Sequence, residues 1–232
     1  MAGDLAVFDL DGTLVDTGPD LVDTTNVVLS ARGHPTVPPE TIRHHIGLGA
    51  RAMIEGALSA SGITLPPDEM DAIHEDYVVS YAGRIARLSR PFPEMLACLD
   101  ALEAAGVALA VCTNKKESLA RQLLDELGLL HRFAALSGGD TYGVSKPDPR
   151  HLLNTVVDAG GASHRTVFVG DSRIDRETAR AANVPIVAVT YGYSDVPVGT
   201  LSPDRLLGPG EDVAAAVLDL LASRPMVALT MR

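Results

Sequence analysis

Residues 5–14 of the chain read LAVFDLDGTL, a short apolar run that ends in two carboxylates and a turn. Side chains two residues apart in a strand lie on the same face, so Asp9 and Asp11 would leave the end of this strand together. In open α/β sheets, ligands bind beyond the carboxyl ends of parallel strands. Two acids and the backbone amides of the Gly12-Thr13 turn at such an edge suit a divalent cation and a phosphate group.

Further short apolar runs predict more strands of the same sheet. The expected strands lie at residues 5–8, 107–112, 166–169 and 186–190, and helical patterns occur at residues 94–105, 117–127, 150–158, 175–182 and 212–223. Continuous apolar strands that alternate with helices indicate a parallel sheet that is covered on both faces. The expected fold class is therefore α/β, with a doubly wound parallel sheet as a Rossmann-like core.

The segment between the first strand and the rest of the sheet has a different pattern. Helical periodicity occurs at residues 20–31, 39–45, 50–61 and 68–85, and glycine- or proline-containing stretches separate these helices. No strand pattern interrupts them. We therefore expect two domains, an α/β core of residues 1–16 and 91–232 and a small inserted α-helical cap of residues 17–90.

Charge and cysteine usage restrict the partners and the compartment. The chain of 232 residues has a net charge of -11 and a pI near 5.0, whereas nucleic acids and anionic membrane surfaces select a basic face. Neither partner is expected. Cys98 and Cys112 form no recognisable spacing pattern, and no signal peptide or membrane span is evident, so we expect a cytoplasmic protein. The sequence does not distinguish a monomer from a homodimer.

Four short motifs carry the polar residues expected at the sheet edge. They read DLDGT at residues 9–13, TNK at 113–115, KP at 146–147 and GDSRID at 170–175. Each is expected to follow a strand of the parallel sheet, which would bring all four to one edge. Each alone has an ordinary structural explanation as a turn, a helix cap or a loop lysine. Together and in this order they indicate one reaction site.

The order and spacing of these motifs resemble those of the haloacid dehalogenase superfamily of phosphatases, and most closely the phosphoglycolate phosphatase family. The resemblance rests on DLDGTLVD at residues 9–16, CTNK at 112–115, VGDSR at 169–173 and TYGY at 190–193, and on IGLGA at 46–50 in the expected cap. It implies a phosphomonoester hydrolase that converts 2-phosphoglycolate and water to glycolate and phosphate through an aspartyl-phosphate. One departure is Asn183, where the family usually has glycine.

The residue types fit the roles that the resemblance implies. Asp9 is the expected nucleophile, and Asp11 the acid that protonates the leaving oxygen and then accepts a proton from water. Thr113 and the backbone amide of Asn114 are expected to bind phosphate oxygens. Lys146 is expected to offset negative charge on the nucleophile and on the phosphoryl group.

The resemblance also implies a Mg²⁺ site. The expected ligands are the Asp9 carboxylate, the backbone carbonyl of Asp11 and the Asp171 carboxylate. Asp175 is expected to orient these ligands or the waters between them. Oxygen ligands and retained waters suit this ion.

The cap is expected to recognise the leaving group, because the core binds only the phosphoryl group. Gly47 and Gly49 precede an expected helix, and a helix N-terminus favours an anion such as the carboxylate of 2-phosphoglycolate. Arg51 is a candidate partner of this carboxylate, although an arginine on a helix is more often a solvated surface residue. Tyr77 and Tyr81 are expected to pack against another cap helix and not to line a pocket.

The motifs leave other activities open. Residues 16–90 contain no lysine, which argues against a phosphonatase that forms a Schiff base in the cap, and Asp11 argues against a dehalogenase. A sugar phosphomutase resembling β-phosphoglucomutase, and a pyrophosphatase or nucleotidase of the same superfamily, would share the core motifs. A non-enzymatic regulatory protein would not need the complete set of four motifs.

Overall fold

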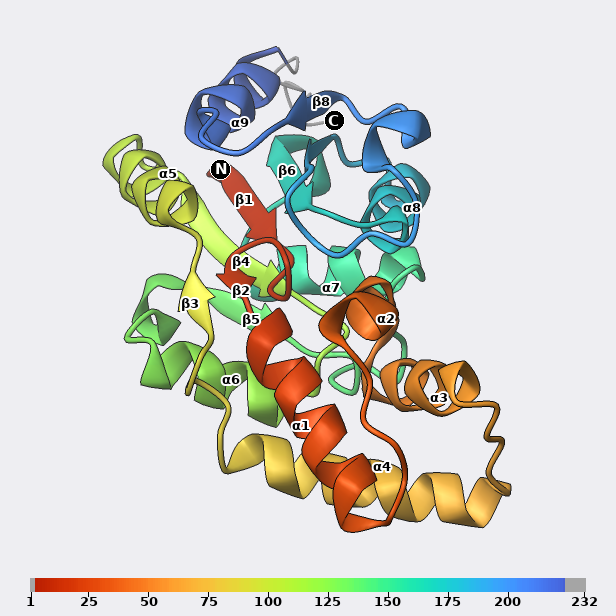
Figure 1. Ribbon diagram of the computed structural model, residues 1–232. Coiled ribbons are helices and arrows are strands. Elements are labelled where there is room, and N and C mark those ends of the chain that lie inside the picture. The colour runs from red at the N-terminus through yellow and green to blue at the C-terminus, as the bar shows by residue number, and fades with distance from the viewer. Residues whose placement is uncertain (1–2, 224–232) are drawn as a thin grey trace.

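A six-stranded parallel sheet forms the centre of the α/β part of the chain (Figure 1). The computed structural model describes residues 3–223, so residues 1–2 and 224–232 of the expected core lie outside it. The strands are β1 (Leu5–Phe8), β4 (Ala108–Cys112), β5 (Ala135–Ser137), β6 (Thr166–Gly170), β7 (Ile186–Val189) and β8 (Arg205–Leu207). Their order, β5-β4-β1-β6-β7-β8, runs outward from β1 in both directions, which is the doubly wound arrangement. The carboxyl end of β1 therefore lies at the point where a ligand site is expected.

Helices cover both faces of this sheet. They are α5 (Pro93–Ala104), α6 (Glu117–Glu126), α7 (Pro149–Asp158), α8 (Arg173–Ala182) and α9 (Val213–Ala222), with short 3-10 helices at Leu130–Arg132, Ser163–Arg165 and Val198–Leu201. Within β1, Ala6 and Phe8 pack with the cluster that includes α5 and α9, whereas Leu5 and Val7 pack with α7 and α8. Because alternate side chains reach opposite apolar layers, the strand is apolar at every position.

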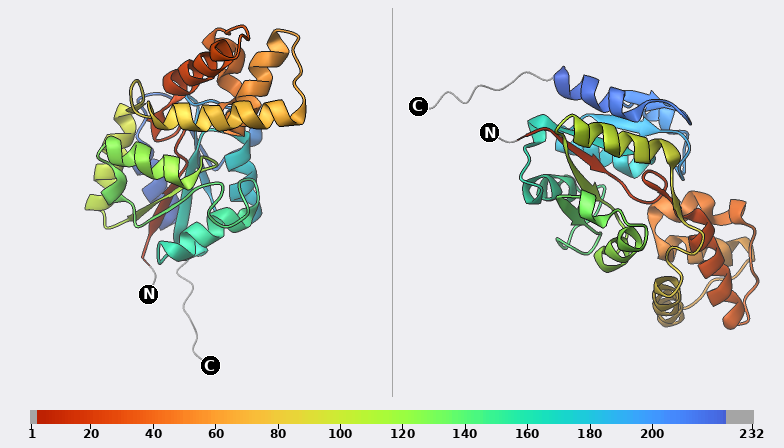
Figure 2. Two further views of the ribbon diagram at one scale, coloured as in Figure 1. Left: turned by 90° about the horizontal axis from the view of Figure 1, so that it is seen from below. Right: turned by 90° about the vertical axis from the view of Figure 1, so that its left-hand side faces the viewer.

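A helical insertion separates β1 from β4 (Figure 2). It contains α1 (Gly18–Ala31), α2 (Pro39–Ile42), a 3-10 helix (Arg43–Leu48), α3 (Ala50–Ala60) and α4 (Pro67–Ala82). The chain enters and leaves it through two short antiparallel strands, β2 (Val15–Asp16) and β3 (Arg90–Pro91). Buried Asp20 of α1 stabilises the segment just before β3, where the chain leaves the insertion. Its carboxylate accepts hydrogen bonds from the backbone N–H groups of Leu88 and Ser89 and from the Ser89 hydroxyl, at 2.7 to 3.0 Å.

The element boundaries differ from the sequence pattern in a few places. The edge strands β5 and β8 were not expected, because each has three residues and carries little periodicity. The helix expected at residues 39–45 breaks at Ile42 and continues as a 3-10 helix. Asn183 ends α8 with a φ of 54°, a left-handed conformation that asparagine tolerates better than most residues, so it replaces the usual glycine. Within residues 3–223, no helix has the length and apolar character needed to cross a membrane.

Candidate active site

Asp9 is the first residue after β1, at the carboxyl edge of the sheet. Its backbone N–H donates to the Val169 carbonyl at 2.9 Å, which continues the pairing of β1 with β6 and fixes the direction of the side chain. Burial of the carboxyl raises the pKa of Asp9 to about 7, although Lys146 opposes the shift, and Asp175 adds to it. A poorly hydrated carboxylate at the wall of a cavity is a suitable nucleophile toward a phosphoryl group.

Lys146 lies between two of the acids. Its Nζ is 2.8 Å from Asp9 Oδ1 and 2.7 Å from Asp175 Oδ1, and the side chain is 2% exposed. Burial alone would lower the pKa of Lys146, but Asp175 and Asp9 outweigh it and raise the pKa, so the side chain is an ammonium. Lys146 was expected to follow a strand directly. It instead lies well along the loop between β5 and α7. Asn114 holds that loop, because its Oδ1 accepts from Lys146 N at 2.9 Å and its Nδ2 donates to Lys146 O at 3.0 Å.

Asp171 follows β6, and residues from two other segments fix its carboxylate. Oδ1 accepts from the Thr13 hydroxyl at 2.7 Å, and Oδ2 accepts from the Tyr193 backbone N–H at 2.6 Å. Glycine is required around it: a Cβ on Gly12, which has a φ of +85°, would lie 2.7 Å from Asp171 Oδ2, and one on Gly192 would lie 2.1 Å away. The local chain therefore holds the carboxylate in one orientation.

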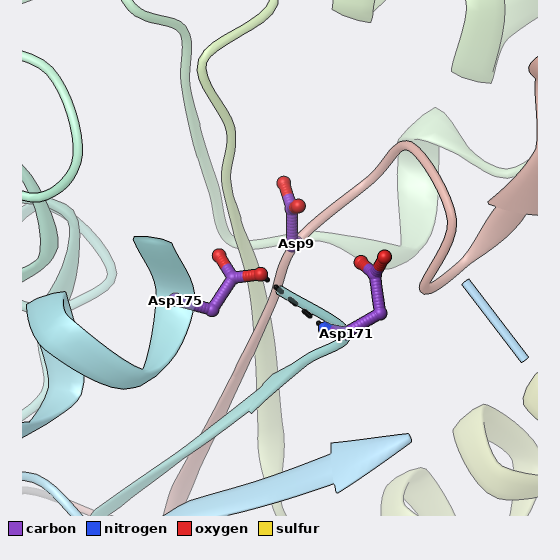
Figure 3. A group of neighbouring side chains, drawn as sticks. All are labelled: Asp9, Asp171 and Asp175. Atoms are coloured by element: carbon purple, nitrogen blue, oxygen red, sulfur yellow. Dashed lines mark hydrogen bonds between the residues drawn. The ribbon is translucent and has the colours of Figure 1, made fainter. Parts of the chain in front are cut away.

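Asp175 lies in the first turn of α8, where Ser172 is the N-cap. The serine hydroxyl accepts from the Asp175 N–H, and Asp175 Oδ2 in turn accepts from the Ser172 backbone N–H at 3.0 Å and from its hydroxyl at 2.6 Å, so the two residues form a capping box. The Asp171 N–H also donates to Asp175 Oδ2, at 3.3 Å (Figure 3). With Lys146 on the other oxygen, Asp175 is positioned to orient neighbouring groups.

The three buried carboxylates form a cluster with excess negative charge. Asp9, Asp171 and Asp175 each offer an oxygen, and these oxygens all lie within 4.8 Å of one another (Figure 3). Burial raises the pKa of Asp171 well above its ordinary value, and Asp175 and Asp9 raise it further. Lys146 supplies a single positive charge against three acids. The oxygen-only donor set and the remaining charge fit a divalent cation.

Asp11 is not a member of this cluster, and its carboxylate pairs with Lys115. Lys115 Nζ lies 3.0 Å from Oδ1 and 3.2 Å from Oδ2 of Asp11. Thr113 follows β4 and is buried, and its hydroxyl accepts from the Lys115 backbone N–H at 3.2 Å. Asp11 is thus outside the group of three buried carboxylates, paired with Lys115, and lines the same cavity as Asp9.

A cavity of about 390 Å³ lies between the sheet edge and the helical insertion. Asp9, Asp11 and Thr113 line it from the sheet edge, and Gly47, Gly49 and Arg51 line it from the insertion. The structure thus brings the expected groups from both parts of the chain to one space. Such a cavity can bind a ligand where polar groups in its wall can form hydrogen bonds or ion pairs with that ligand.

The structure bears on two expectations about the insertion. Tyr77 and Tyr81 are buried and stack on each other with centroids 6.0 Å apart, but they also line the cavity, so the expectation that they avoid a pocket was wrong. Arg51 lines the cavity but is 44% exposed and already paired, with Asp71 at 2.6 Å and with Glu55 at 3.3 Å. A substrate carboxylate would therefore have to compete with Asp71 and Glu55 for this guanidinium.

Some residues of the site had no role in the sequence-based prediction. The hydrogen bond from Thr13 to Asp171 spans 158 positions, and the pairing of Lys115 with Asp11 spans 104. No local pattern indicates contacts of this range. The capping box could have been found, because Ser172 followed three positions later by Asp175 is a helix-start signature.

Comparisons of the sequence and of the structure with known proteins point to the same family. Residues 6–189 match the model of the haloacid dehalogenase-like hydrolases. The chain is 44% identical over 220 residues to a phosphoglycolate phosphatase of Agrobacterium fabrum, covering 95% of this chain and 94% of that protein. It is 36% identical over 187 residues to an N-acetylmuramic acid 6-phosphate phosphatase of Pseudomonas aeruginosa, covering 81% of each chain. A crystal structure of a predicted phosphoglycolate phosphatase from Haemophilus somnus superposes with a TM-score of 0.84 and 30% identity, covering 94% of this chain and 97% of the other.

Proposed function

The chain belongs to the haloacid dehalogenase-like hydrolase family and is a phosphatase, and we propose that it is a Mg²⁺-dependent enzyme that hydrolyses 2-phosphoglycolate to glycolate and phosphate. One observation carries the proposal: buried Asp9 lies beside the Lys146 ammonium at 2.8 Å and at the wall of a cavity that Asp11 also lines. A nucleophile, a cation and a separate acid–base group therefore meet in one space.

The reaction proceeds in two transfers. Asp9 attacks phosphorus in line with the ester oxygen, so that a bond from the carboxylate to phosphorus forms and the bond to the leaving oxygen breaks. Asp11 donates a proton to the leaving oxygen, which departs as the hydroxyl of glycolate. Water then attacks the phosphorus of the aspartyl-phosphate, Asp11 takes the proton, and phosphate leaves with Asp9 restored.

The other residues hold charge and orientation during these transfers. Lys146, fixed through Asn114, lies close enough to Asp9 to offset charge on the phosphoryl oxygens. Thr113 and the Asn114 amide are placed at the end of β4, where they can donate to those oxygens. Asp9, Asp171 and the Asp11 carbonyl would hold Mg²⁺, which when bound supplies positive charge to the phosphoryl oxygens. Asp175 keeps Lys146 and the Asp171 loop in place.

A substrate panel tests the proposed function. The initial rates of phosphate release are measured for 2-phosphoglycolate, ethyl phosphate, N-acetylmuramic acid 6-phosphate, a sugar bisphosphate, a nucleoside monophosphate and pyrophosphate. The highest kcat/KM is expected for 2-phosphoglycolate, with activity lost on addition of EDTA and restored by Mg²⁺. A higher kcat/KM for another phosphoester, or an isomerised sugar phosphate as product, would replace the proposed substrate.

Two variants at the residues that flank strand β1 separate chemistry from folding. Asp9→Asn keeps the size of the side chain but removes the nucleophile, and turnover is expected to fall by at least about 10³-fold. Asp4→Asn lies before the other end of the same strand, where Asp4 pairs with Arg165 at 2.6 Å, and is expected to retain wild-type turnover. Near-normal activity of Asp9→Asn would contradict the proposed mechanism.

A further inference from the structure

Lys115 is a buried cation of the cavity wall that the phosphoryl chemistry does not use. Its side chain is 5% exposed, and its Nζ contacts both oxygens of Asp11. The same Nζ lies 4.5 Å from the ring centroid of Tyr81, over its face. A cation over an aromatic ring is stabilised by the charge distribution of the ring, and more so where water is excluded. Lys115 is therefore held at a defined place beside the acid–base group.

The other lysines and arginines that line this cavity have no ion pair with Asp11 among the described residues. Lys146 lies between two carboxylates of the acidic cluster, and Arg51 is bound to acids of its own helical neighbourhood. Lys116 is exposed. Within residues 3–223, Lys115 is the cavity-lining cation that is both buried and in contact with Asp11.

The dimensions of the substrate place its carboxylate at Lys115. The ester oxygen of 2-phosphoglycolate must lie within hydrogen-bond reach of Asp11 to receive a proton. A single methylene separates that oxygen from the carboxylate, so the carboxylate cannot lie far from Asp11. Because Lys115 Nζ is 3.0 Å from Asp11, it is within reach of the same carboxylate.

The tyrosines beside Lys115 add a second polar feature to this wall. The hydroxyls of Tyr77 and Tyr81 are buried and have no hydrogen-bond partner among residues 3–223. Burial raises the pKa of both hydroxyls, so both keep their protons and can act only as neutral donors or acceptors. Buried polar groups nearly always have a hydrogen-bond partner, so these two hydroxyls can accept one that the described part of the chain does not supply.

We propose that Lys115 binds the carboxylate of the leaving group, and that the Asp11 carboxylate occupies Lys115 when no substrate is bound. The inference rests on the proposed function and names the group that recognises its substrate. On binding, the substrate carboxylate replaces Asp11 as the ionic partner of Lys115. Asp11 is then free to turn toward the leaving oxygen. Specificity for a short acid thus comes from the core segment after β4, and not from Arg51 of the insertion.

Lys115→Met tests the proposal on two substrates that differ in the carboxylate. Methionine keeps the length of the side chain without the charge, and ethyl phosphate has the size of 2-phosphoglycolate without the acid. The variant is expected to lose about 10- to 100-fold in kcat/KM for 2-phosphoglycolate, mostly through KM, as for the loss of a charge-assisted hydrogen bond. For ethyl phosphate, kcat is expected to stay the same or rise, because Asp11 is no longer occupied by Lys115.

The controls make each outcome decisive. Arg121→Met removes an exposed cation of α6 that pairs with Glu117 and is not among the residues lining the cavity, and it is expected to leave both substrates unchanged. Lys115→Arg is expected to recover part of the preference for the acid. Turnover of ethyl phosphate shows that a variant is folded. An equal loss of kcat/KM for both substrates in Lys115→Met would mean that the lysine positions Asp11 and does not bind the substrate carboxylate. If the wild-type enzyme shows no preference for 2-phosphoglycolate over ethyl phosphate, that result would contradict the proposed function and the carboxylate subsite that rests on it.

Discussion

Replacing Lys146 by methionine should destabilise the folded protein as well as abolish turnover. At an effective dielectric constant of about 20, each ion pair of Lys146, at 2.8 Å to Asp9 and 2.7 Å to Asp175, corresponds to a Coulomb energy of about 6 kcal/mol. The cost of removing the three charges from water offsets most of this. Loss of one partner of a buried ion pair nevertheless costs about 3–5 kcal/mol, because the remaining carboxylates are buried without a cation.

The pH dependence of this loss has a defined sign. Carboxyl groups whose pKa is raised in the folded state bind more protons there than in the unfolded chain, so the free energy of unfolding falls as the pH rises. The pKa of Asp9 is already raised to about 7 with Lys146 present, and it should rise further in Lys146→Met. The destabilisation should therefore be larger at pH 8 than at pH 6. Mg²⁺ should stabilise the variant more than the wild type, since the cluster has lost its own cation.

Urea denaturation and thermal unfolding, each with EDTA and with Mg²⁺, measure the effect. A loss of about 3–5 kcal/mol corresponds to a decrease in Tm of about 10 °C for a chain of this size. Lys116→Met, which removes an exposed lysine, is the matched control and should change the Tm very little. A decrease in the free energy of unfolding below about 1 kcal/mol for Lys146→Met, or one equal to that of the control, would refute the inference that Lys146 stabilises the acidic cluster.

Two further predictions follow from other buried groups. Burial, assisted by the positive charge of Lys146, lowers the pKa of His151 to about 4. Between pH 6.5 and 4 the unfolded chain therefore binds more protons than the folded protein. The free energy of unfolding should fall by about 3 kcal/mol as the pH falls through this range. Urea titrations of wild type and His151→Gln should show a flatter pH dependence in the variant, and identical curves would exclude the histidine as the cause. A Cβ on Gly192 would lie 2.1 Å from Asp171 Oδ2, so Gly192→Ala should weaken Mg²⁺ binding by about 10- to 100-fold in calorimetric titrations, whereas Gly83→Ala, whose Cβ would meet only Ser80 O at 3.7 Å, should not. Unchanged Mg²⁺ affinity in Gly192→Ala would mean that Asp171 does not hold the ion.

The α/β core could be predicted because its strands are buried on both faces. A strand such as β1 is apolar at every position, and this composition is visible without any tertiary information. The edge strand β8 is different, because Arg205 and Leu206 are exposed and the strand has only three residues. Pairing with β7 defines such a strand, and the sequence pattern alone does not.

The convergence of the acids could also be predicted, whereas their partners could not. Asp9 and Asp171 follow neighbouring parallel strands, so the topology alone brings them together. The engagement of Arg51 with Asp71 depends on how α3 packs against α4, and this packing determines whether the arginine is free. The placement of Lys115 beside Asp11 likewise depends on the direction in which the segment after β4 turns.

Detection of a phosphoryl group on Asp9 tests the proposed mechanism most directly. The wild-type enzyme is mixed with 2-phosphoglycolate and Mg²⁺, quenched in acid within the first turnovers, and the peptide that contains residues 5–14 is examined by mass spectrometry. A phosphoryl group on Asp9 that forms together with a burst of glycolate, ahead of the release of inorganic phosphate, and is absent from Asp9→Asn is the expected result. Multiple turnovers without any phosphorylated Asp9, together with near-normal turnover by Asp9→Asn, would contradict the assignment of Asp9 as the nucleophile.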